Sequence, residues 1–301
     1  MPRHVLSSAL VYGLPVPPRR LKSIFGDRPI IVYFVNFVNL VYTEVMTKII
    51  SVVNQKGGVG KTTTAMNLAA FLAELGSFVL LVDMDPQANA TSGLGLQRED
   101  VKHGIYEALS GQKRFHDIVF NTGHTGLRIA PATANLAGAN IELVDVERRE
   151  HQLLDLLEEA RHAYDYIIID CPPSLGLLTI NSLVAADELL IPVQAEYYAL
   201  EGLGQLLNTI QLIQEHIKPE LNILGAVITM FDKRTRLSED IMNELYRYFP
   251  DTIFRSIIPR TVRLAEAPSF GKTILQYDPN GKGAKAYERL AREILEKHSN
   301  Y

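Results

Sequence analysis

The chain has 301 residues, 47% of them hydrophobic and 21% charged, which suits one large α/β domain or two small ones. Its 30 basic and 34 acidic residues give a formal net charge of −4, which excludes a general polycation, so any contact with nucleic acid has to come from a local basic patch. The single cysteine, Cys171, excludes an intramolecular disulfide, fits a reducing cytoplasm and argues against a cysteine-based metal cluster within one chain.

Residues 1–45 differ from the rest of the chain. They combine a proline- and arginine-rich stretch with an apolar run, Ile30–Tyr42, that Asn36 and Asn39 interrupt. This run is too short and too interrupted to predict a membrane span, and no cleavage site of a secretory signal follows it. Met46 directly precedes the first convincing strand. We therefore expect an extension over residues 1–45, either mistranslated upstream sequence or a poorly ordered segment, and a domain over residues 46–301.

From residue 46 onward, short apolar runs alternate with amphipathic stretches. The β-branched run Lys48–Val53 predicts a buried parallel strand, and helical spacing of apolar residues predicts a helix over Ala65–Leu75. This alternation predicts a doubly wound, mainly parallel sheet with helices on both faces, whose ligands bind at the carboxyl ends of the strands. The further strands are expected at Phe78–Val82, Leu127–Ala130, Tyr166–Ile169, Glu188–Val193 and Ile223–Thr229, and the further helices at Arg149–Arg161, Leu177–Ala185, Glu201–Glu215 and Ser238–Tyr248.

The loop between the first strand and the first helix carries the strongest motif. Residues 55–64 read Gln-Lys-Gly-Gly-Val-Gly-Lys-Thr-Thr-Thr, which nearly matches the phosphate-loop pattern G-x-x-x-x-G-K-[ST]. Such glycines let backbone N–H groups face phosphate oxygens at the positive end of the following helix. Lys61 is expected to reach the β- and γ-phosphates, and the Thr62 hydroxyl to take a Mg²⁺ position. Lys56 is a second lysine with no evident role on its own loop.

Acidic residues end two of the predicted strands. Asp83 and Asp85 follow the second strand two residues apart and point the same way from an extended chain, before Pro86 stops the strand. One of these carboxylates could serve the Mg²⁺ hydration shell while the other orients an attacking water. The apolar strand at Tyr166–Ile169 ends in Asp170, which is the Walker B arrangement for a Mg²⁺ contact.

Five segments together resemble the ParA/Soj family of partition ATPases, which carry the deviant Walker A motif. The resemblance runs from about Met46 to the end of the chain and implies a P-loop NTPase fold of the deviant Walker A type. It also implies ATP and Mg²⁺ as cofactors and a sandwich homodimer with two ATP molecules at its interface. The segments are Gln55–Thr64, Asp83–Gly95, Ala130–Leu143, Asp170–Gly176 and Ile258–Lys272.

The same resemblance assigns roles to individual residues. Lys56 reaches the phosphates of the partner's ATP, where a cation offsets developing charge, and Asp85 positions the hydrolytic water. With Lys61 these form the implied catalytic set. The implied nucleotide-binding residues are Lys56, Gly57, Gly58, Val59, Gly60, Lys61, Thr62, Thr63, Pro259 and Thr261, the last at a position that is often Asn in the family. The implied Mg²⁺ residues are Thr62, Asp83 and Asp170.

The resemblance finally implies an output on DNA. Arg234 and Arg263 match positions that bind double-stranded DNA without sequence preference, with help from Lys233, Arg236, Arg255 and Lys272. A ParB-like centromere-binding protein is the expected partner that stimulates hydrolysis, which makes the chain a cytoplasmic, nucleoid-associated ATPase of chromosome or plasmid partition. The alternative is a MinD-like membrane-associated ATPase. We expect no stable membrane association, because acidic residues mix with the basic ones along Ala284–His298.

Overall fold

The computed structural model describes the backbone of residues 31–35 and 38–42, and then residues 47–196, 199–232, 234, 242, 245–247, 249 and 252–299. By the contacts between its residues the chain divides into two units, Met1–Val45 and Met46–Tyr301. In the first unit, β1 (Ile31–Val35) pairs with β2 (Val38–Tyr42) in an antiparallel hairpin. That residues 1–45 are mistranslated or poorly ordered stays a prediction.

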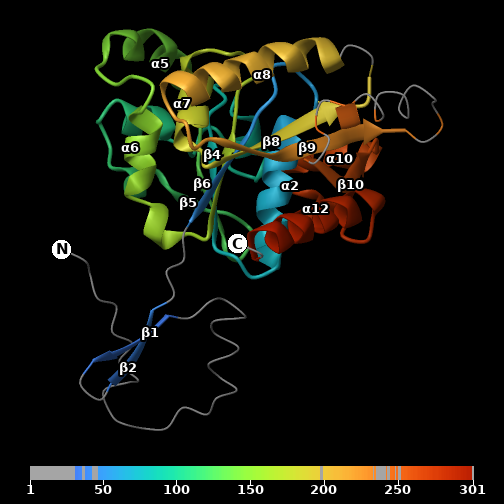
Figure 1. The fold of residues 1–301 in the computed structure, drawn as a ribbon, viewed down its shortest axis with the longest axis horizontal. Coiled ribbons are helices and arrows are strands. Elements are labelled where there is room, and N and C mark those ends of the chain that lie inside the picture. Colours follow the sequence, from blue (N-terminus) through green and yellow to red (C-terminus); the bar gives the residue numbers. More distant parts are fainter. Residues whose placement is uncertain are drawn as a thin grey trace. The chain divides into compact units, whose positions relative to one another are not determined.

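The second unit is built on an eight-stranded sheet in the order β10-β9-β8-β3-β7-β4-β6-β5 (Figure 1). Every pair in it is parallel except β5 with β6, so the expected mainly parallel sheet is confirmed. The strands are β3 (Lys48–Val52), β4 (Val79–Asp83), β5 (Phe120–Asn121), β6 (Leu127–Ala130), β7 (Tyr166–Asp170), β8 (Glu188–Gln194), β9 (Asn222–Phe231) and β10 (Ile253–Pro259).

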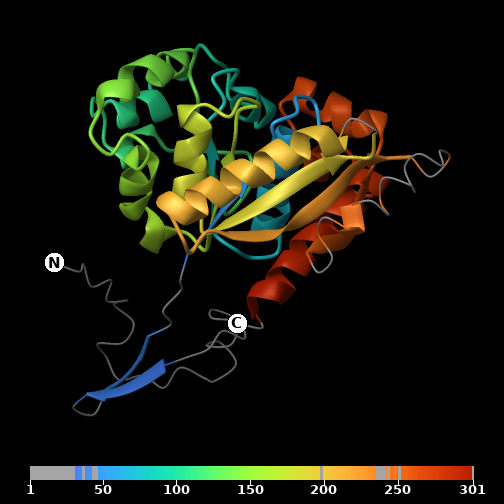
Figure 2. The same ribbon diagram turned by 45° about the horizontal axis from the view of Figure 1, so that its top comes forward.

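Helices connect these strands and cover both faces of the sheet (Figure 2). The α-helices are α2 (Lys61–Glu74), α3 (Asn89–Gly93), α4 (Ile105–Leu109), α5 (Leu136–Glu142), α6 (Gln152–Glu158), α7 (Leu177–Ala185), α8 (Ala199–His216), α10 (Val262–Glu266), α11 (Ile274–Tyr277) and α12 (Lys282–Ser299). The 3₁₀ turns are η2 (Phe115–Ile118), η3 (Leu143–Asp145), η4 (Arg161–Ala163) and η5 (Ala267–Phe270).

Two hydrophobic cores lie on opposite faces of the sheet because side chains alternate along each strand. In β7, Ile167 and Ile169 join the core beneath α5, α6, α7 and α8, whereas Tyr166 and Ile168 join the core beneath α2, α10, α11 and α12. Both faces of the central strands are therefore apolar, which is why these strands read as continuous hydrophobic runs. No helix among the described residues is long and apolar enough to span a membrane.

One expected helix is shorter than predicted, and another is described only in part. The expected helix Arg149–Arg161 is shorter in the structure, where α6 covers Gln152–Glu158 and η4 follows. The expected helix Ser238–Tyr248 lies largely outside the described residues.

Candidate nucleotide site at the carboxyl ends of the strands

The phosphate loop joins the end of β3 to the start of α2. Gly58 has φ 76° and Gly60, the residue before the first helical residue Lys61, has φ 91°. Both values lie in the left-handed region, which glycine adopts without the strain that a Cβ would cause. The loop therefore curls over the amino end of α2, whose free N–H groups and dipole suit a phosphate.

Hydrogen bonds to the distant strands β8 and β9 hold this loop in place. Asn54 Oδ1 accepts a hydrogen bond from the Lys56 N–H at 3.0 Å, and Asn54 Nδ2 donates to the Pro192 carbonyl of β8 at 2.7 Å. On the other side of the loop, the Thr229 hydroxyl of β9 donates to the Val59 carbonyl at 2.8 Å. Sequence reasoning did not single out Asn54 or Thr229, because the contacts that give them a role lie far away in the chain.

Lys61 lies inside the loop. Its side chain is buried, and its ammonium donates to the Lys56 carbonyl at 3.1 Å. Burial lowers the pKa of Lys61, while the charges of Asp170 and Asp85 act in the opposite direction. This buried ammonium donates to a backbone carbonyl and is well placed to bind phosphate oxygens instead.

Asp83 and Asp170 lie side by side at the edge of the sheet. They end β4 and β7 and are partners in the parallel register, and both are fully buried. Asp83 accepts hydrogen bonds from the Thr91 N–H at 2.9 Å, the Thr91 hydroxyl at 2.7 Å and the Asp85 N–H at 3.2 Å. Burial raises the pKa of Asp83 to about 6, although the hydrogen bonds from Thr91 lower it. Thr91 is a third residue of this site that the sequence did not reveal.

Asp170 has the environment of a cation ligand. Neither of its carboxylate oxygens has a hydrogen-bond partner among the described residues. Burial, followed by the charge of Asp83, raises its pKa well above the ordinary value, and the nearby Thr62 hydroxyl offsets part of this rise. A buried carboxylate without a partner is costly unless a cation neutralises it.

These residues fit Mg²⁺ bound together with a nucleotide. The described residues contain no cluster of three or more acidic, histidine or cysteine side chains that could hold a metal alone. Mg²⁺ commonly binds through one or two carboxylates and through the phosphates of its substrate, which suits Asp170 beside the phosphate loop. The Asp83 oxygens already accept three hydrogen bonds, so Asp170 is better placed than Asp83 for direct contact with Mg²⁺.

The Lys56 side chain is directed towards Glu196. Its ammonium is 3.9 Å from Glu196 Oε2, and the other Glu196 oxygen accepts a hydrogen bond from Arg260 Nη2 at 2.8 Å. The Lys56 and Glu196 side chains are 29% and 44% exposed, so this pair is close to solvent. Sequence reasoning missed Glu196 and Arg260, which follow β8 and β10.

The expected adenine-binding residues follow the edge strand β10. Pro259 ends this strand opposite Phe231 of β9. Thr261 precedes α10, and its hydroxyl accepts a hydrogen bond from the Leu264 N–H at 3.2 Å. The Thr261 side chain therefore caps a helix in this structure, and the expected contact with adenine stays a prediction.

A basic cleft of about 1200 Å³ lies beside β10 and α12. It brings together Arg234, Arg255 and Arg263, three of the six basic residues expected to contact DNA. Lys272 does not line the cleft, and Lys233 and Arg236 lie outside the described residues. The basic residues in the lining are Arg234, Arg255, Arg260, Arg263, Lys282, Lys285, Arg289 and Arg292.

Most arginines of this cleft already have acidic partners. Arg234 binds Asp232 at 2.7 Å, and its hydrogen bonds lower the pKa of Asp232 to about 2. Arg263 lies 3.5 Å from Glu266, with its guanidinium 5.7 Å from the centre of the Tyr277 ring. A phosphate that binds these arginines has to compete with carboxylates that are already in place.

Comparison with known proteins agrees with this site. A family model described as an AAA domain matches residues 47–223. The chain is 55% identical over 249 residues to the sporulation initiation inhibitor protein Soj of Bacillus subtilis, covering 83% of this chain and 98% of that protein. It is 50% identical over 250 residues to the chromosome partitioning protein ParA of Myxococcus xanthus, covering 83% and 88%.

Among solved structures, the fold is similar to a cobyrinic acid a,c-diamide synthase from Mycobacterium smegmatis with bound ADP and magnesium. The TM-score is 0.75 and the identity 36%, over 85% of this chain and 97% of that one. Together with the phosphate loop and its two strand-end carboxylates, these matches show that the chain belongs to the ParA/Soj family of chromosome-partitioning ATPases.

Proposed function

We propose that the protein is an ATP-driven partition switch, in which ATP and Mg²⁺ bring two copies together around two nucleotides. The observation that carries the proposal is the position of the two lysines. The Lys61 side chain points into the loop, whereas the Lys56 side chain is directed towards Glu196 and lies close to solvent. A cation that is not needed for its own nucleotide is available for the nucleotide of a second copy.

Hydrolysis then uses residues from both chains. Thr62 and Asp170 would hold Mg²⁺, with Asp83 beside Asp170, and the ion would neutralise charge on the phosphates when bound. Asp85 is buried, and one of its oxygens accepts a hydrogen bond from the Gln87 N–H at 3.0 Å, which fixes the carboxylate where it can orient a water. Lys61 and the partner's Lys56 offset the charge that develops on the transferred phosphoryl group.

The output of the switch is non-specific binding to double-stranded DNA. The basic cleft supports this output, because scattered arginines and lysines bind phosphates regardless of base sequence. A dimer presents two such clefts, so ATP-driven dimerisation strengthens binding without any new contact. Hydrolysis stimulated by a ParB-like centromere-binding protein separates the copies and releases the DNA. The ATP-bound dimer would accordingly be associated with the nucleoid in the cytoplasm.

A MinD-like membrane role has weaker support. The apolar side of α12 is buried against the domain through Ala284, Tyr287, Leu290, Ala291 and Ile294, and is therefore not free to enter a lipid surface. Co-sedimentation with anionic liposomes in the presence of ATP tests this alternative directly.

The test of the proposed function is the ATPase rate at a stated salt concentration. The rate is measured alone, with plasmid DNA, with a purified centromere-binding protein of the same cells, with both, and with anionic liposomes. We expect strong stimulation only when both are present. A rate that liposomes raise and that DNA with the centromere-binding protein leaves unchanged would instead support the membrane role.

A further inference from the structure

The strand β9 is irregular close to its carboxyl end. In its register with β10, Ile228 lies opposite Ile257 and Phe231 lies opposite Pro259. Three steps along β9 therefore match two steps along β10, so β9 carries one extra residue. We call residues 229–230, which lie between the two matched positions of β9, the β9 bulge. Bulges of this kind redirect side chains and are common beside active sites.

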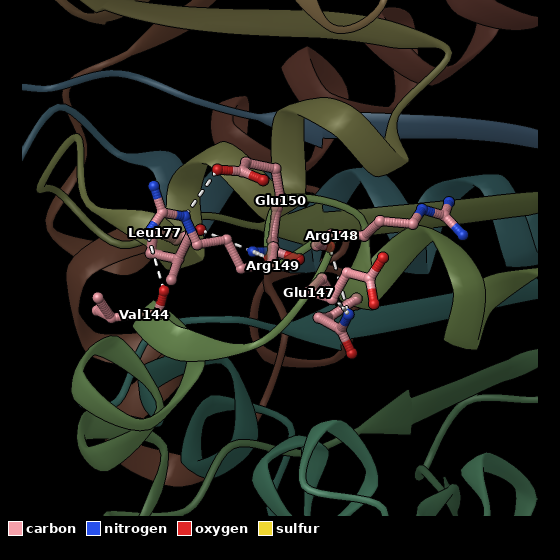
Figure 3. A network of polar contacts seen from close by, with 8 residues as sticks. Val144, Glu147, Arg148, Arg149, Glu150 and Leu177 are labelled. Atoms are coloured by element: carbon pink, nitrogen blue, oxygen red, sulfur yellow. Dashed lines mark hydrogen bonds and ion pairs between the residues drawn. The ribbon is translucent and has the colours of Figure 1, made fainter.

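Met230 of the β9 bulge has a strained backbone. Its φ is 52°, in the left-handed region that residues other than glycine rarely adopt. Ala88 and Arg148 also have positive φ, but each lies in a turn that precedes a helix. Figure 3 shows Arg148 beside a polar network in which Arg149 Nη1 donates to the Val144 carbonyl at 2.8 Å. Met230 instead lies within a strand, where such strain persists only if contacts on both sides fix the backbone.

Thr229 connects the β9 bulge to the phosphate loop. Its side chain is buried, its hydroxyl donates to the Val59 carbonyl at 2.8 Å, and its Cγ2 lies 4.0 Å from the position of a Cβ added at Gly60. The Val59 carbonyl and the Gly60 N–H belong to one planar trans peptide and point in opposite directions. The Gly60 N–H is therefore directed away from Thr229, and no described residue accepts a hydrogen bond from it. This N–H is available to a phosphate oxygen.

Phe231 and Asp232 connect the other side of the β9 bulge to the basic cleft. The Phe231 carbonyl accepts a hydrogen bond from the Arg260 N–H at 3.1 Å. Asp232 accepts hydrogen bonds from the Arg234 N–H at 3.0 Å and from Arg234 Nη2 at 2.7 Å. All four of these residues line the cleft. The backbone is therefore held by the phosphate loop before Met230 and by the cleft after it.

We propose that the β9 bulge couples the phosphate loop to the basic cleft. Thr229 is a positioning residue of the loop, because it holds the Val59 carbonyl and so directs the Gly60 N–H towards the nucleotide. When a bound phosphate shifts this peptide, Thr229 moves with it, and the constrained backbone at Met230 passes the shift to Arg234 in the cleft. The effect on DNA rests on the proposed function, but the coupling itself can be measured without DNA.

The test uses a single fluorescent reporter. The chain contains no tryptophan, so Phe231→Trp places one directly after the β9 bulge, in the wall of the cleft. In this background, Thr229→Val removes the hydroxyl but keeps the shape of the side chain, whereas Thr229→Ser keeps the hydroxyl. Thr47→Val is the matched control, because the Thr47 hydroxyl is also buried and donates to a backbone carbonyl, that of Tyr164 at 2.7 Å, at the opposite edge of the sheet.

Tryptophan emission is measured with ADP and with a slowly hydrolysed ATP analogue, each with Mg²⁺. The protein is diluted until ultracentrifugation shows only single chains, so that dimerisation cannot cause the signal. Nucleotide affinity and melting temperature are measured for the same Thr229 and Thr47 variants with Phe231 in place, which keeps the test independent of the reporter.

We expect saturating nucleotide to change the emission of the reporter. Thr229→Val should bind nucleotide roughly tenfold more weakly, since the buried Val59 carbonyl loses its donor, and should lose most of the emission change even at saturation. Thr229→Ser should retain the affinity and the emission change. Thr47→Val should retain both as well, although it melts at a lower temperature than the parent.

The coupling is overturned if saturating nucleotide leaves the reporter unchanged, or if the full emission change survives in Thr229→Val. Unchanged nucleotide affinity of Thr229→Val would overturn the positioning role of Thr229. If the reporter responds as expected but the ATP-bound dimer does not retain DNA, the coupling stands and the DNA output of the proposed function fails.

Discussion

Replacing Glu196 by Gln should make ATP-driven dimerisation easier. In the single chain, Glu196 holds the Lys56 ammonium at 3.9 Å and the Arg260 guanidinium at 2.8 Å. For Lys56 to reach the nucleotide of a second copy, its pair with Glu196 has to break. Gln keeps a carbonyl oxygen for Arg260 but removes the charge that attracts Lys56, so the substitution removes this cost and disturbs little else.

The size of the effect follows from the exposure of the pair. The two side chains are 29% and 44% exposed, and ion pairs of this kind contribute about 0.2–1 kcal/mol. A symmetric dimer gives up two of them, a total of about 0.4–2 kcal/mol, which corresponds to about a two- to thirtyfold lower dissociation constant of the dimer. Salt screens such exposed pairs, so the difference between variant and parent should shrink as ionic strength rises.

Analytical ultracentrifugation with a slowly hydrolysed ATP analogue and Mg²⁺ measures this dissociation constant. Glu288→Gln is the matched control, because Glu288 forms a 2.8 Å pair with Arg292 and is 41% exposed, similar to Glu196. The reasoning is refuted if Glu196→Gln dimerises no more tightly than the parent at low salt. It is also refuted if Glu288→Gln gains as much, since the effect would then be one of net charge alone.

Three further substitutions test the site itself. Asp85→Ala should retain ATP binding, measured by a fluorescent nucleotide, and lose turnover; normal turnover would remove Asp85 from its role. Arg234→Glu should spare dimerisation and abolish DNA retention at moderate salt in a gel-shift assay, and retention would show that the DNA patch lies elsewhere. Asp170→Asn removes an unpartnered buried charge, so the nucleotide-free variant should melt at a higher temperature than the parent at pH 8. The pKa of Asp170 is higher in the folded chain than in the unfolded chain, so the parent becomes more stable as the pH falls from the folded-state pKa towards the unfolded-state pKa. The difference in melting temperature between variant and parent should therefore narrow on acidification. A variant that melts at a lower temperature than the parent at pH 8 would contradict this reasoning.

The sequence predicted the central sheet because its strands are buried on both faces and read as apolar runs. It ended the strands β4 and β7 one residue too early, because a charged residue usually marks the end of a buried apolar strand. In the structure Asp83 and Asp170 are the last residues of these strands and are partners in the parallel register. The expected helix at Arg149–Arg161 began too early for a different reason. Arg148 has φ 52°, and the Arg149 carbonyl accepts a hydrogen bond from the buried Asn181 amide. Helical periodicity carries no information on such a tertiary hydrogen bond.

The candidate site was predicted unevenly for a similar reason. Its phosphate loop is local, and its two carboxylates end neighbouring parallel strands, so spacing and strand order suffice to bring them together. Thr91, Glu196 and Arg260 belong to the site only because loops after different strands meet at one edge of the sheet. Their contacts form in three dimensions, and no pattern in the residues around each of them indicates its partner.

The arrangement of the basic cleft explains why DNA binding should depend on dimerisation. Arg234, Arg255 and Arg263 each lie within 4 Å of a carboxylate of their own chain, so each phosphate contact replaces an existing ion pair. The net gain per contact is then small, and one chain alone should hold DNA weakly. The two clefts of a dimer would bind the same duplex, so that their small binding free energies add. Once the first cleft is bound, the second meets the DNA at a high effective concentration. If the cleft binds DNA as proposed, the carboxylates beside the arginines would weaken DNA binding by a single chain, and ATP would control it through dimerisation.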